Sequence, residues 1–353
     1  MNILFTSSDP GSSQQNNALA TGLKKSGFKI GYITTKRNEL FYNENYNKRN
    51  LIDDKIVEEN DLINFIDEFN PDFIITGLSV EKKNIDYTIC KIAKNLNIKS
   101  GCIQDYYGYI GNYDFDVAPD YIFVFDDYAK GLTARTNLFN RNNIIITGSP
   151  KHERYHDKIY TWFKNLRSIK YNNKEIIVFL QPLNIPGVME NMNYLCDEII
   201  NSRPKYTINV KPHPQDSESP RLEKFLDKYP FKIIGNKYCN EVLLLYYKNI
   251  FSCYSTIAYD AYYLFNKVIN SKINKIHNIL IGQNIYKTIE KLNFDIKETP
   301  QYKMGINIIN KRDLSNAVNI VFSRNNEIPN IELSKVKQYK KNSIENIIKI
   351  IKK

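Results

Sequence analysis

The stretch YTINVKPHPQD, Tyr206–Asp216, decides how this chain is built. It begins as an apolar, strand-like run and ends with two prolines on either side of His213. Proline cannot continue a central strand or occupy a helix interior, and the residue before a proline is held extended. The chain therefore leaves a sheet near Lys211, with an imidazole on a stiff turn at the end of a strand.

Similar short apolar runs recur along the chain and alternate with amphipathic, helix-like stretches. The predicted strands are Ile3–Phe5, Lys29–Ile33, Phe73–Thr76, Ser100–Ile103, Tyr121–Phe125, Ile144–Thr147, Ile176–Leu180, Tyr206–Val210, Lys232–Ile234, Ile250–Ser252 and Lys267–Asn270. Helices are expected at Ala18–Ser26, Asn60–Phe69, Lys83–Leu96 and Tyr194–Asn201. Strands that alternate with helices form parallel sheets, so the fold class is α/β.

Chain length indicates two domains. A length of 353 residues exceeds the roughly 150 residues of one domain, and 42% hydrophobic residues suffice for two cores. The polar segment Lys151–Lys174 is the predicted boundary. We expect two Rossmann-like domains facing a cleft: an acceptor domain at 1–155 and a nucleotide-donor domain at 156–335, followed by a basic C-terminal helix at 336–353.

Bulk composition limits the partners and the compartment. The formal net charge of +11 suits anionic ligands, acidic lipid or nucleic acid. The five cysteines have no metal-binding spacing, which favours a reduced, cytoplasmic protein. The N-terminus lacks the features of a signal peptide, and no run of about 18 apolar residues predicts a membrane span.

The C-terminal tail from Lys335 to Lys353 combines seven lysines with one helical apolar face. Ile344, Ile347, Ile348 and Ile351 recur at the spacing of one side of a helix. Two interpretations stay open: a helix packed on the body of the protein, or a basic helix that contacts the inner face of a membrane.

Candidate ligand-binding residues follow the strands of the C-terminal half. Ligands of open α/β sheets bind at the carboxyl ends of strands, where Lys211, His213 and Pro214 lie. Ser255 and Thr256 follow another strand, where they either cap the next helix or bind a phosphate at its N-terminus. The loops Gly148-Ser149-Pro150 and Gln181-Pro182 are predicted to line the cleft between the domains.

Candidate residues of the N-terminal half are carboxylates, hydroxyls and aromatic rings. Asp105 directly follows a predicted strand. Its carboxylate is either a general base or an ordinary turn aspartate. Glu81 is a weaker candidate of the same kind, and Tyr107 offers a ring for stacking on a sugar. The polar segment 6–17 has neither a dinucleotide fingerprint nor a Walker A loop. We predict that it forms a mobile acceptor-binding loop, with Ser8 and Ser12 as contacts.

In their order along the chain, these motifs resemble those of GT-B glycosyltransferases that build bacterial surface polysaccharides, such as capsule and lipopolysaccharide. His213-Pro214 resembles the His-Pro motif of bacterial sialyltransferases and Kdo transferases, and Ser255-Thr256 their Ser-Ser/Thr motif. A related pattern occurs in CDP-glycerol glycerophosphotransferases. Asp105 matches the acidic motif loosely, since those enzymes often show Asp-Asp-Gly.

The resemblance implies a nucleotide-sugar donor, with a CMP-activated acidic sugar favoured and a CDP-linked polyol as the alternative. It implies a glycan or lipid-linked glycan acceptor, and neither a metal nor a cofactor. Lys211, His213, Ser255 and Thr256 would then bind the donor phosphate, and Asp105 would deprotonate the acceptor hydroxyl.

Two other functions compete with this hypothesis. A non-hydrolysing nucleotide-sugar epimerase shares the GT-B fold, but it needs several acids and histidines around the sugar, and this chain has four histidines. A basic nucleic-acid-binding protein would cluster its lysines and aromatics. Here the 26 tyrosines are scattered, so specific nucleic-acid binding is not expected.

Overall fold

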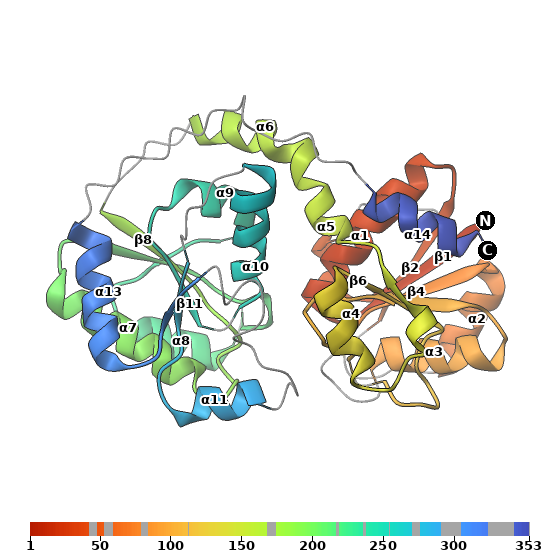
Figure 1. Cartoon of the computed structure of the whole chain (residues 1–353), viewed down its shortest axis with the longest axis horizontal. Helices are drawn as coiled ribbons and strands as arrows, with labels where there is room; N and C mark the ends of the chain where they lie inside the picture. The colour runs from red at the N-terminus through yellow and green to blue at the C-terminus, as the bar shows by residue number, and fades with distance from the viewer. Residues whose placement is uncertain are drawn as a thin grey trace. The chain divides into compact units, whose positions relative to one another are not determined.

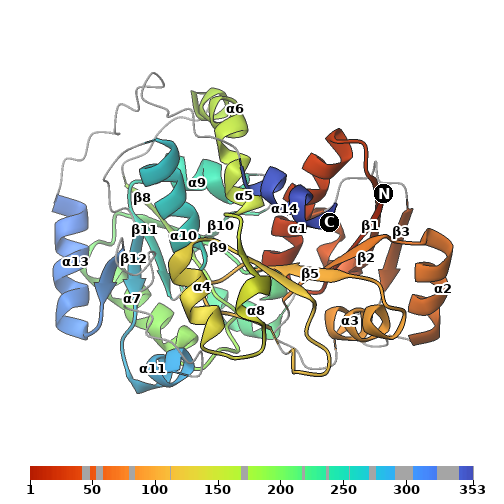
Figure 2. The ribbon, with the colours of Figure 1, turned by 45° about the vertical axis from the view of Figure 1, so that its right-hand side comes forward.

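The structure is a computed structural model of the chain, and it forms two compact units. Unit 1 contains residues 1–154 and 340–353, and unit 2 contains residues 155–339. The described residues are 1–41, 48–52, 59–78, 84–111, 113–167, 174–216, 219–235, 238–253, 255–269, 276–290, 305–323 and 342–352. Each unit is described below by itself (Figure 1 and Figure 2).

Unit 1 is built on a parallel seven-stranded sheet with the order β3-β2-β1-β4-β5-β6-β7. Its strands are β1 (Asn2–Ser7), β2 (Lys29–Thr35), β3 (Lys48–Ile52), β4 (Phe73–Thr76), β5 (Ser100–Ile103), β6 (Tyr121–Val124) and β7 (Ile144–Ile146). Its helices are α1 (Pro10–Lys25), η1 (Lys36–Phe41), α2 (Glu59–Phe69), α3 (Ile85–Asn95), α4 (Asp127–Ala134), η2 (Arg141–Asn143), α5 (Pro150–Glu153) and α14 (Ser343–Ile351). The strand order reverses between β1 and β4, as in a Rossmann fold.

Unit 2 repeats this plan with a parallel six-stranded sheet in the order β10-β9-β8-β11-β12-β13. Its strands are β8 (Glu175–Phe179), β9 (Thr207–Lys211), β10 (Lys232–Ile233), β11 (Ile250–Cys253), β12 (Ile276–Ile279) and β13 (Ile306–Ile308). Its helices are α6 (Tyr155–Arg167), α7 (Val188–Ser202), η3 (Pro214–Asp216), α8 (Pro220–Asp227), α9 (Asn240–Tyr246), α10 (Ile257–Tyr262), η4 (Tyr263–Val268), α11 (Gln283–Glu290) and α13 (Lys311–Ser323).

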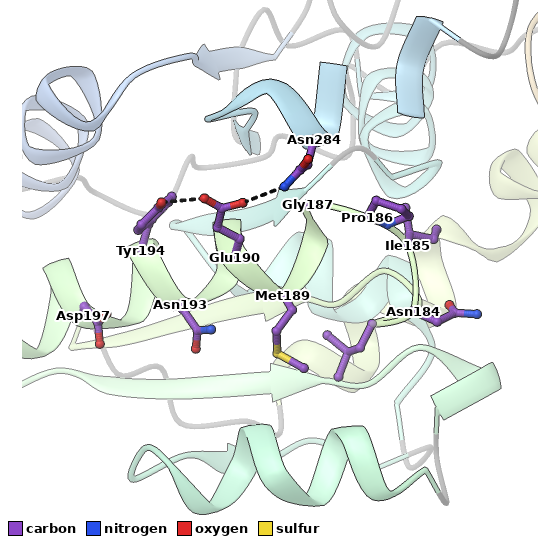
Figure 3. A pocket seen from close by; sticks show the side chains of 11 residues that line it. Asn184, Ile185, Pro186, Gly187, Met189, Glu190, Asn193, Tyr194, Asp197 and Asn284 are labelled. Carbon is purple, nitrogen blue, oxygen red and sulfur yellow. Dashed lines mark hydrogen bonds between the residues drawn. The ribbon is translucent and has the colours of Figure 1, made fainter. Parts of the chain in front are cut away.

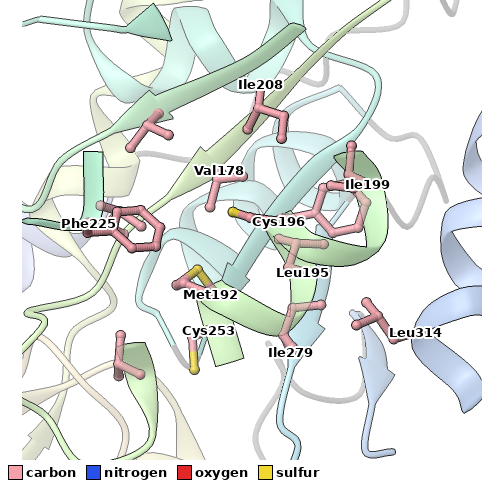
Figure 4. Packing of buried hydrophobic residues seen from close by; sticks show 14 of the residues in the cluster. Val178, Met192, Leu195, Cys196, Ile199, Ile208, Phe225, Cys253, Ile279 and Leu314 are labelled. Atoms are coloured by element: carbon pink, nitrogen blue, oxygen red, sulfur yellow. The ribbon is translucent and has the colours of Figure 1, made fainter. Parts of the chain in front are cut away.

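Both sheets bury both of their faces, which explains why their strands are continuously apolar. In β8, Ile176 and Val178 pack into one core with α7, α8 and α13, a cluster seen in Figure 4. Ile177 and Phe179 point to the opposite face and pack against α6, α9 and α10. Successive side chains of a strand alternate between faces, so one apolar run supplies two cores.

Most of the predicted strands are confirmed, and the exceptions have physical reasons. The prediction of a strand at Lys267–Asn270 is wrong, because the apolar residues Leu264, Phe265 and Val268 lie on the buried side of the π-helical turn η4. The prediction also missed β3, β12 and β13. β3 and β13 are edge strands, which need less apolar sequence, and β12 buries the polar side chains of His277 and Asn278.

The C-terminal helix α14 packs on unit 1. Ile347 and Ile351 are buried in the core that contains α1. Ile344 lies against Gly22 of α1, where a Cβ on the glycine would be 2.7 Å from Ile344 Cγ2. The Glu153 carboxylate accepts hydrogen bonds from the backbone N–H of Ser343 at 2.8 Å and of Ile344 at 3.2 Å. The structure therefore has the packed form of this helix, and its apolar face is not open to a lipid surface.

In the described parts of the chain, no helix combines the length and apolar character that a membrane span needs.

We expect Ile347→Ala to destabilise unit 1 by about 2–5 kcal/mol, because it empties a fully buried site between α14 and the sheet. Chemical denaturation followed by circular dichroism measures this loss. Leu96→Ala, at a position of unit 1 with 43% exposure, is the matched control and should change stability by less than about 0.5 kcal/mol. Equal effects of the two substitutions would show that α14 does not stabilise unit 1.

Candidate active site

The strand order shows where a ligand site is expected in each unit. In doubly wound sheets, ligands bind at the carboxyl ends of the two strands between which the order reverses. These strands are β1 and β4 in unit 1, and β8 and β11 in unit 2. Both edges carry polar side chains, and we call them the unit 1 edge and the unit 2 edge.

A buried carboxylate, Asp86, joins the two central strands at the unit 1 edge. It lies in the first turn of α3 and is 1% exposed. Its Oδ1 accepts hydrogen bonds from Thr6 Oγ1 at 2.7 Å and from the backbone N–H of Gly77 at 2.9 Å. Its Oδ2 accepts from the Ser8 backbone N–H at 3.0 Å and from Ser8 Oγ at 2.7 Å. Asp86 therefore holds together the ends of β1 and β4.

The prediction of a mobile loop at 6–17 is wrong, because α1 begins at Pro10 directly after a short turn. The polar residues of this segment indicated a solvated loop, whereas several of them are buried at the sheet edge. Ser13 bonds Ser7 at 2.7 Å between hydroxyls, and Asn16 donates to the Thr6 carbonyl at 2.8 Å. Ser8 and Ser12 are also buried, and their role as acceptor contacts stays a prediction.

Asp105 follows β5 and lies against the first turn of α1. Its Oδ2 accepts a 3.3 Å hydrogen bond from Ser12 Oγ, and a Cβ on Gly11 would lie only 2.5 Å from that oxygen. Its Oδ1 is covered and has no hydrogen-bond partner among the described residues. Glycine at position 11 thus permits the close approach of the carboxylate to the helix.

This environment raises the pKa of Asp105 to about 7. Burial is the largest cause, and the negative charge of Asp9 adds to it. The Ser12 hydrogen bond and the positive charge of Lys151 oppose the increase. A carboxyl group with a pKa near neutrality exists in both protonation states at physiological pH, which suits a group that takes up and releases protons.

Other residues predicted for this unit have structural contacts. Tyr107 is 2% exposed, packs on Phe125, and donates its hydroxyl to Asp126 at 2.8 Å, so its ring offers no exposed face to a sugar. Ser149 caps α5 and bonds the buried amide of Gln15. Gly148 and Pro150 flank this cap, and Glu81 lies outside the described residues.

At the unit 2 edge, the parallel register aligns three of the predicted loops. Lys211 of β9 pairs with Phe179 of β8, which pairs with Ser252 of β11. The chain leaves the sheet just beyond these positions, and the predicted residues Gln181, Pro182, His213, Pro214, Ser255 and Thr256 follow the three strands. The structure therefore gathers them along one edge of unit 2.

Two of the predicted side chains at the unit 2 edge, Lys211 and Ser255, make hydrogen bonds within the unit. Lys211 donates to the Gly235 carbonyl at 2.8 Å, and burial lowers its pKa. Ser255 Oγ accepts a 3.2 Å hydrogen bond from the backbone N–H of Ile257 at the start of α10, and its role as a phosphate ligand stays a prediction. Thr256 is exposed and makes no side-chain cap bond. His213 is half-buried on its turn.

Sequence reasoning missed the residues that shape the unit 1 edge, namely Asp86, Asp9, Gly11, Gln15 and Lys151. Asp86 has partners up to 80 positions away in the sequence, so no local pattern reveals them. The one available signal was a proline directly after Asp9, which is typical of a helix start.

The chain matches no family model and no curated protein. Solved structures match it over nearly its whole length. The UDP-GlcNAc 2-epimerase of Methanocaldococcus jannaschii, in complex with UDP-GlcNAc and UDP, is 14% identical with a TM-score of 0.63, over 100% of this chain and 99% of that chain. The Arabidopsis thaliana protein UGT89C1, complexed with UDP, is 12% identical with a TM-score of 0.58, over 99% and 98%.

A third similar structure is the glycotransferase of kitacinnamycin, which is 10% identical with a TM-score of 0.54, over 99% of this chain and 94% of that chain. At this level of identity the likeness concerns the fold alone. The chain has the GT-B fold, with two Rossmann-like units, as the sequence predicted.

We expect Asp105→Asn to stabilise unit 1 increasingly as the pH rises from about 4 to 8. Between the unfolded and folded pKa values, about 4 and 7, folded Asp105 retains a proton that the unfolded chain releases. The unfolding free energy of the unsubstituted protein therefore falls with rising pH and levels off above the folded pKa. Asparagine removes this cost, which we put on the order of 1–3 kcal/mol at pH 8. Denaturant titrations across this range measure the difference. Asp67→Asn, at an exposed position on α2, is the control, and parallel curves for both variants would contradict a raised pKa at Asp105.

Proposed function

We propose that the protein is a glycosyltransferase that moves a sugar from a nucleotide donor to an acceptor hydroxyl, with Asp105 as the general base. The observation that carries this proposal is the Asp105 carboxyl group, whose Oδ1 lacks a hydrogen-bond partner among the described residues and whose pKa is about 7. About half of such groups are ionised at neutral pH, which is favourable for general base catalysis.

In the proposed reaction, Asp105 accepts the proton of the acceptor hydroxyl while the hydroxyl oxygen forms a bond to the anomeric carbon of the donor sugar. The bond from that carbon to the donor phosphate oxygen breaks, and the nucleotide leaves with the electron pair. Lys211 and His213 would stabilise the negative charge on the leaving phosphate, with Ser255 and Thr256 as further donors. Electrostatic stabilisation of this kind is often the largest single contribution to catalysis.

For the donor we propose a CMP-activated acidic sugar of the sialic acid or Kdo type. Support comes from the resemblance of His213-Pro214 and Ser255-Thr256 to the motifs of enzymes that use such donors. The net charge of +11 also suits a donor that carries its own carboxylate. A CDP-linked polyol donor would use the same two turns, and the acceptor would be a glycan or lipid-linked glycan.

A nucleotide-sugar 2-epimerase is the second candidate, favoured by the solved epimerase structure that matches the whole chain. The two functions differ in their need for an acceptor. An epimerase converts its nucleotide sugar when no acceptor is present, whereas a transferase leaves the sugar intact apart from slow hydrolysis. Incubation of the protein with CMP-sugars and UDP-GlcNAc alone, followed by product analysis, therefore separates them.

We expect Asp105→Asn to lower the transfer rate by about 10²–10⁴-fold without weakening donor binding, because asparagine cannot accept the hydroxyl proton. The pH–rate profile of the unsubstituted enzyme should rise through about pH 7, the pKa of Asp105, and the variant should lose this limb. Radiolabelled sugar transfer measures both, and a retained limb in the variant would assign the base elsewhere.

A second pair of variants tests the geometry of Asp105 without removing its carboxyl group. Gly11→Ala would place a methyl group 2.5 Å from Asp105 Oδ2, so the carboxylate must move and the transfer rate should fall. Gly131→Ala in α4 is the matched control, because its Cβ would have no neighbour within 4 Å. Equal rates in the two variants would argue against a positioned base.

We expect His213→Ala to lower transfer by about 10²–10³-fold, the usual effect of losing one group that stabilises transition-state charge. Melting temperatures with CMP, CDP, UMP, UDP and GDP then test donor choice. A nucleotide at 100 times its Kd stabilises a protein by about 2.7 kcal/mol, and His213→Ala should reduce the shift that CMP or CDP produces. Stabilisation by UDP or GDP but not by cytidine nucleotides would refute the proposed donor.

A further inference from the structure

Unit 2 contains a pocket that none of the predicted site residues line. Its volume is about 520 Å³, within the usual range for small-molecule sites. The lining consists of the segment 183–187, the outer face of α7 from Met189 to Asp197, and Asn284 of α11 (Figure 3). The pocket begins directly after Gln181-Pro182, the loop that follows β8.

Buried polar contacts fix the walls of this pocket. Asn191 is fully buried, donates to the carbonyls of Gly187 at 2.6 Å and Ile281 at 3.0 Å, and accepts from the Ile281 backbone N–H at 2.6 Å. Gly187 has a φ of +87°, and a Cβ there would lie 2.6 Å from the backbone nitrogen of Ile285. Asp216 accepts from the Leu183 backbone N–H at 2.7 Å. The pocket is thus preformed, which lowers the entropic cost of binding a ligand.

The polar groups of the pocket suit hydroxyl groups. Glu190 lies between Tyr194 and Asn284 in Figure 3, with its Oε1 2.6 Å from the Tyr194 hydroxyl and its Oε2 3.5 Å from Asn284 Nδ2. Each carboxylate oxygen has a second lone pair, and the side-chain amides of Asn184, Asn193 and Asn284 both donate and accept. A ligand with several hydroxyls can use these groups together.

The charged residues that line this pocket are carboxylates, which disfavour the donor phosphate there. Glu190 and Asp197 are among the eleven described lining residues, which include no lysine, arginine or histidine, although the chain as a whole carries +11. Asp197 has Lys228 at 3.9 Å, whereas Glu190 has no ion pair among the described residues. Lys228 contacts Asn193 at 3.3 Å and Lys311 lies over the Tyr194 ring, so two cations lie beside lining residues. The Glu190 carboxylate in the lining still disfavours phosphates and acidic sugars, and it accepts hydrogen bonds from neutral ones.

We propose that this pocket binds a neutral sugar residue, with Glu190 accepting hydroxyl hydrogen bonds and the apolar side chains of Ile185, Pro186 and Met189 contacting the C–H face of the ring. The binding of a neutral sugar in this pocket does not depend on the proposed function.

Saturation-transfer NMR with maltotriose and chitotriose tests the binding, and N-acetylneuraminic acid is the acidic comparison. We expect signals from at least one neutral sugar, at an affinity on the order of 1 mM, and none from the acid. Glu190→Ala should weaken binding at least about tenfold, the loss expected for one charge-assisted hydrogen bond. Glu223→Ala, at an exposed position on α8, should leave it unchanged.

Circular dichroism verifies that Glu190→Ala is folded, and Asn193→Ala takes its place if it is not. Absence of signal from both neutral sugars, or equal signals in the pocket and control variants, would overturn the proposal. Neutral-sugar binding without any transfer activity would refute the proposed function and leave the sugar site standing.

Discussion

The unit 1 edge depends on one buried carboxylate. Asp86 accepts four hydrogen bonds, two from backbone N–H groups and two from hydroxyls, at the ends of β1 and β4. A buried charge is stable only when such donors surround it, and hydrogen bonds to a charged group contribute about 1.5–3 kcal/mol each. The turn that Asp86 fixes leads directly into α1, so the carboxylate also determines where the first turn of that helix lies.

The position of α1 explains the unusual state of Asp105. Gly11 and Ser12 of the first turn approach the carboxylate closely, cover it from water, and supply only one long hydrogen bond. Asp86 and Asp105 thus belong to the same edge but have opposite environments. Asp86 accepts four hydrogen bonds, whereas Asp105 has a covered oxygen without a partner among the described residues. Unsatisfied groups of this kind lower stability, and proteins retain them where chemistry requires a reactive group.

Sequence reasoning was successful where the signal is local. The apolar runs identified most strands, because a strand buried on both faces reads as continuously apolar. It failed at α1, since Ser12, Ser13 and Asn16 are polar and yet buried against the sheet edge. Asp105 could be identified as a candidate base because it directly follows a strand. Its raised pKa could not be predicted from the sequence, since Asp9 and Lys151 influence the carboxyl group only once the chain is folded.

The two units differ in the charge that they place at their ligand edges. Unit 1 presents the carboxylates Asp9 and Asp105 beside α1, whereas unit 2 presents Lys211 and His213 after β9. In the proposed reaction the second set would stabilise a nucleotide phosphate, and Asp105 of the first set would accept the hydroxyl proton. On this proposal the same Rossmann plan supports two chemical tasks, because the tasks depend on the side chains at the strand ends and not on the sheet that carries them.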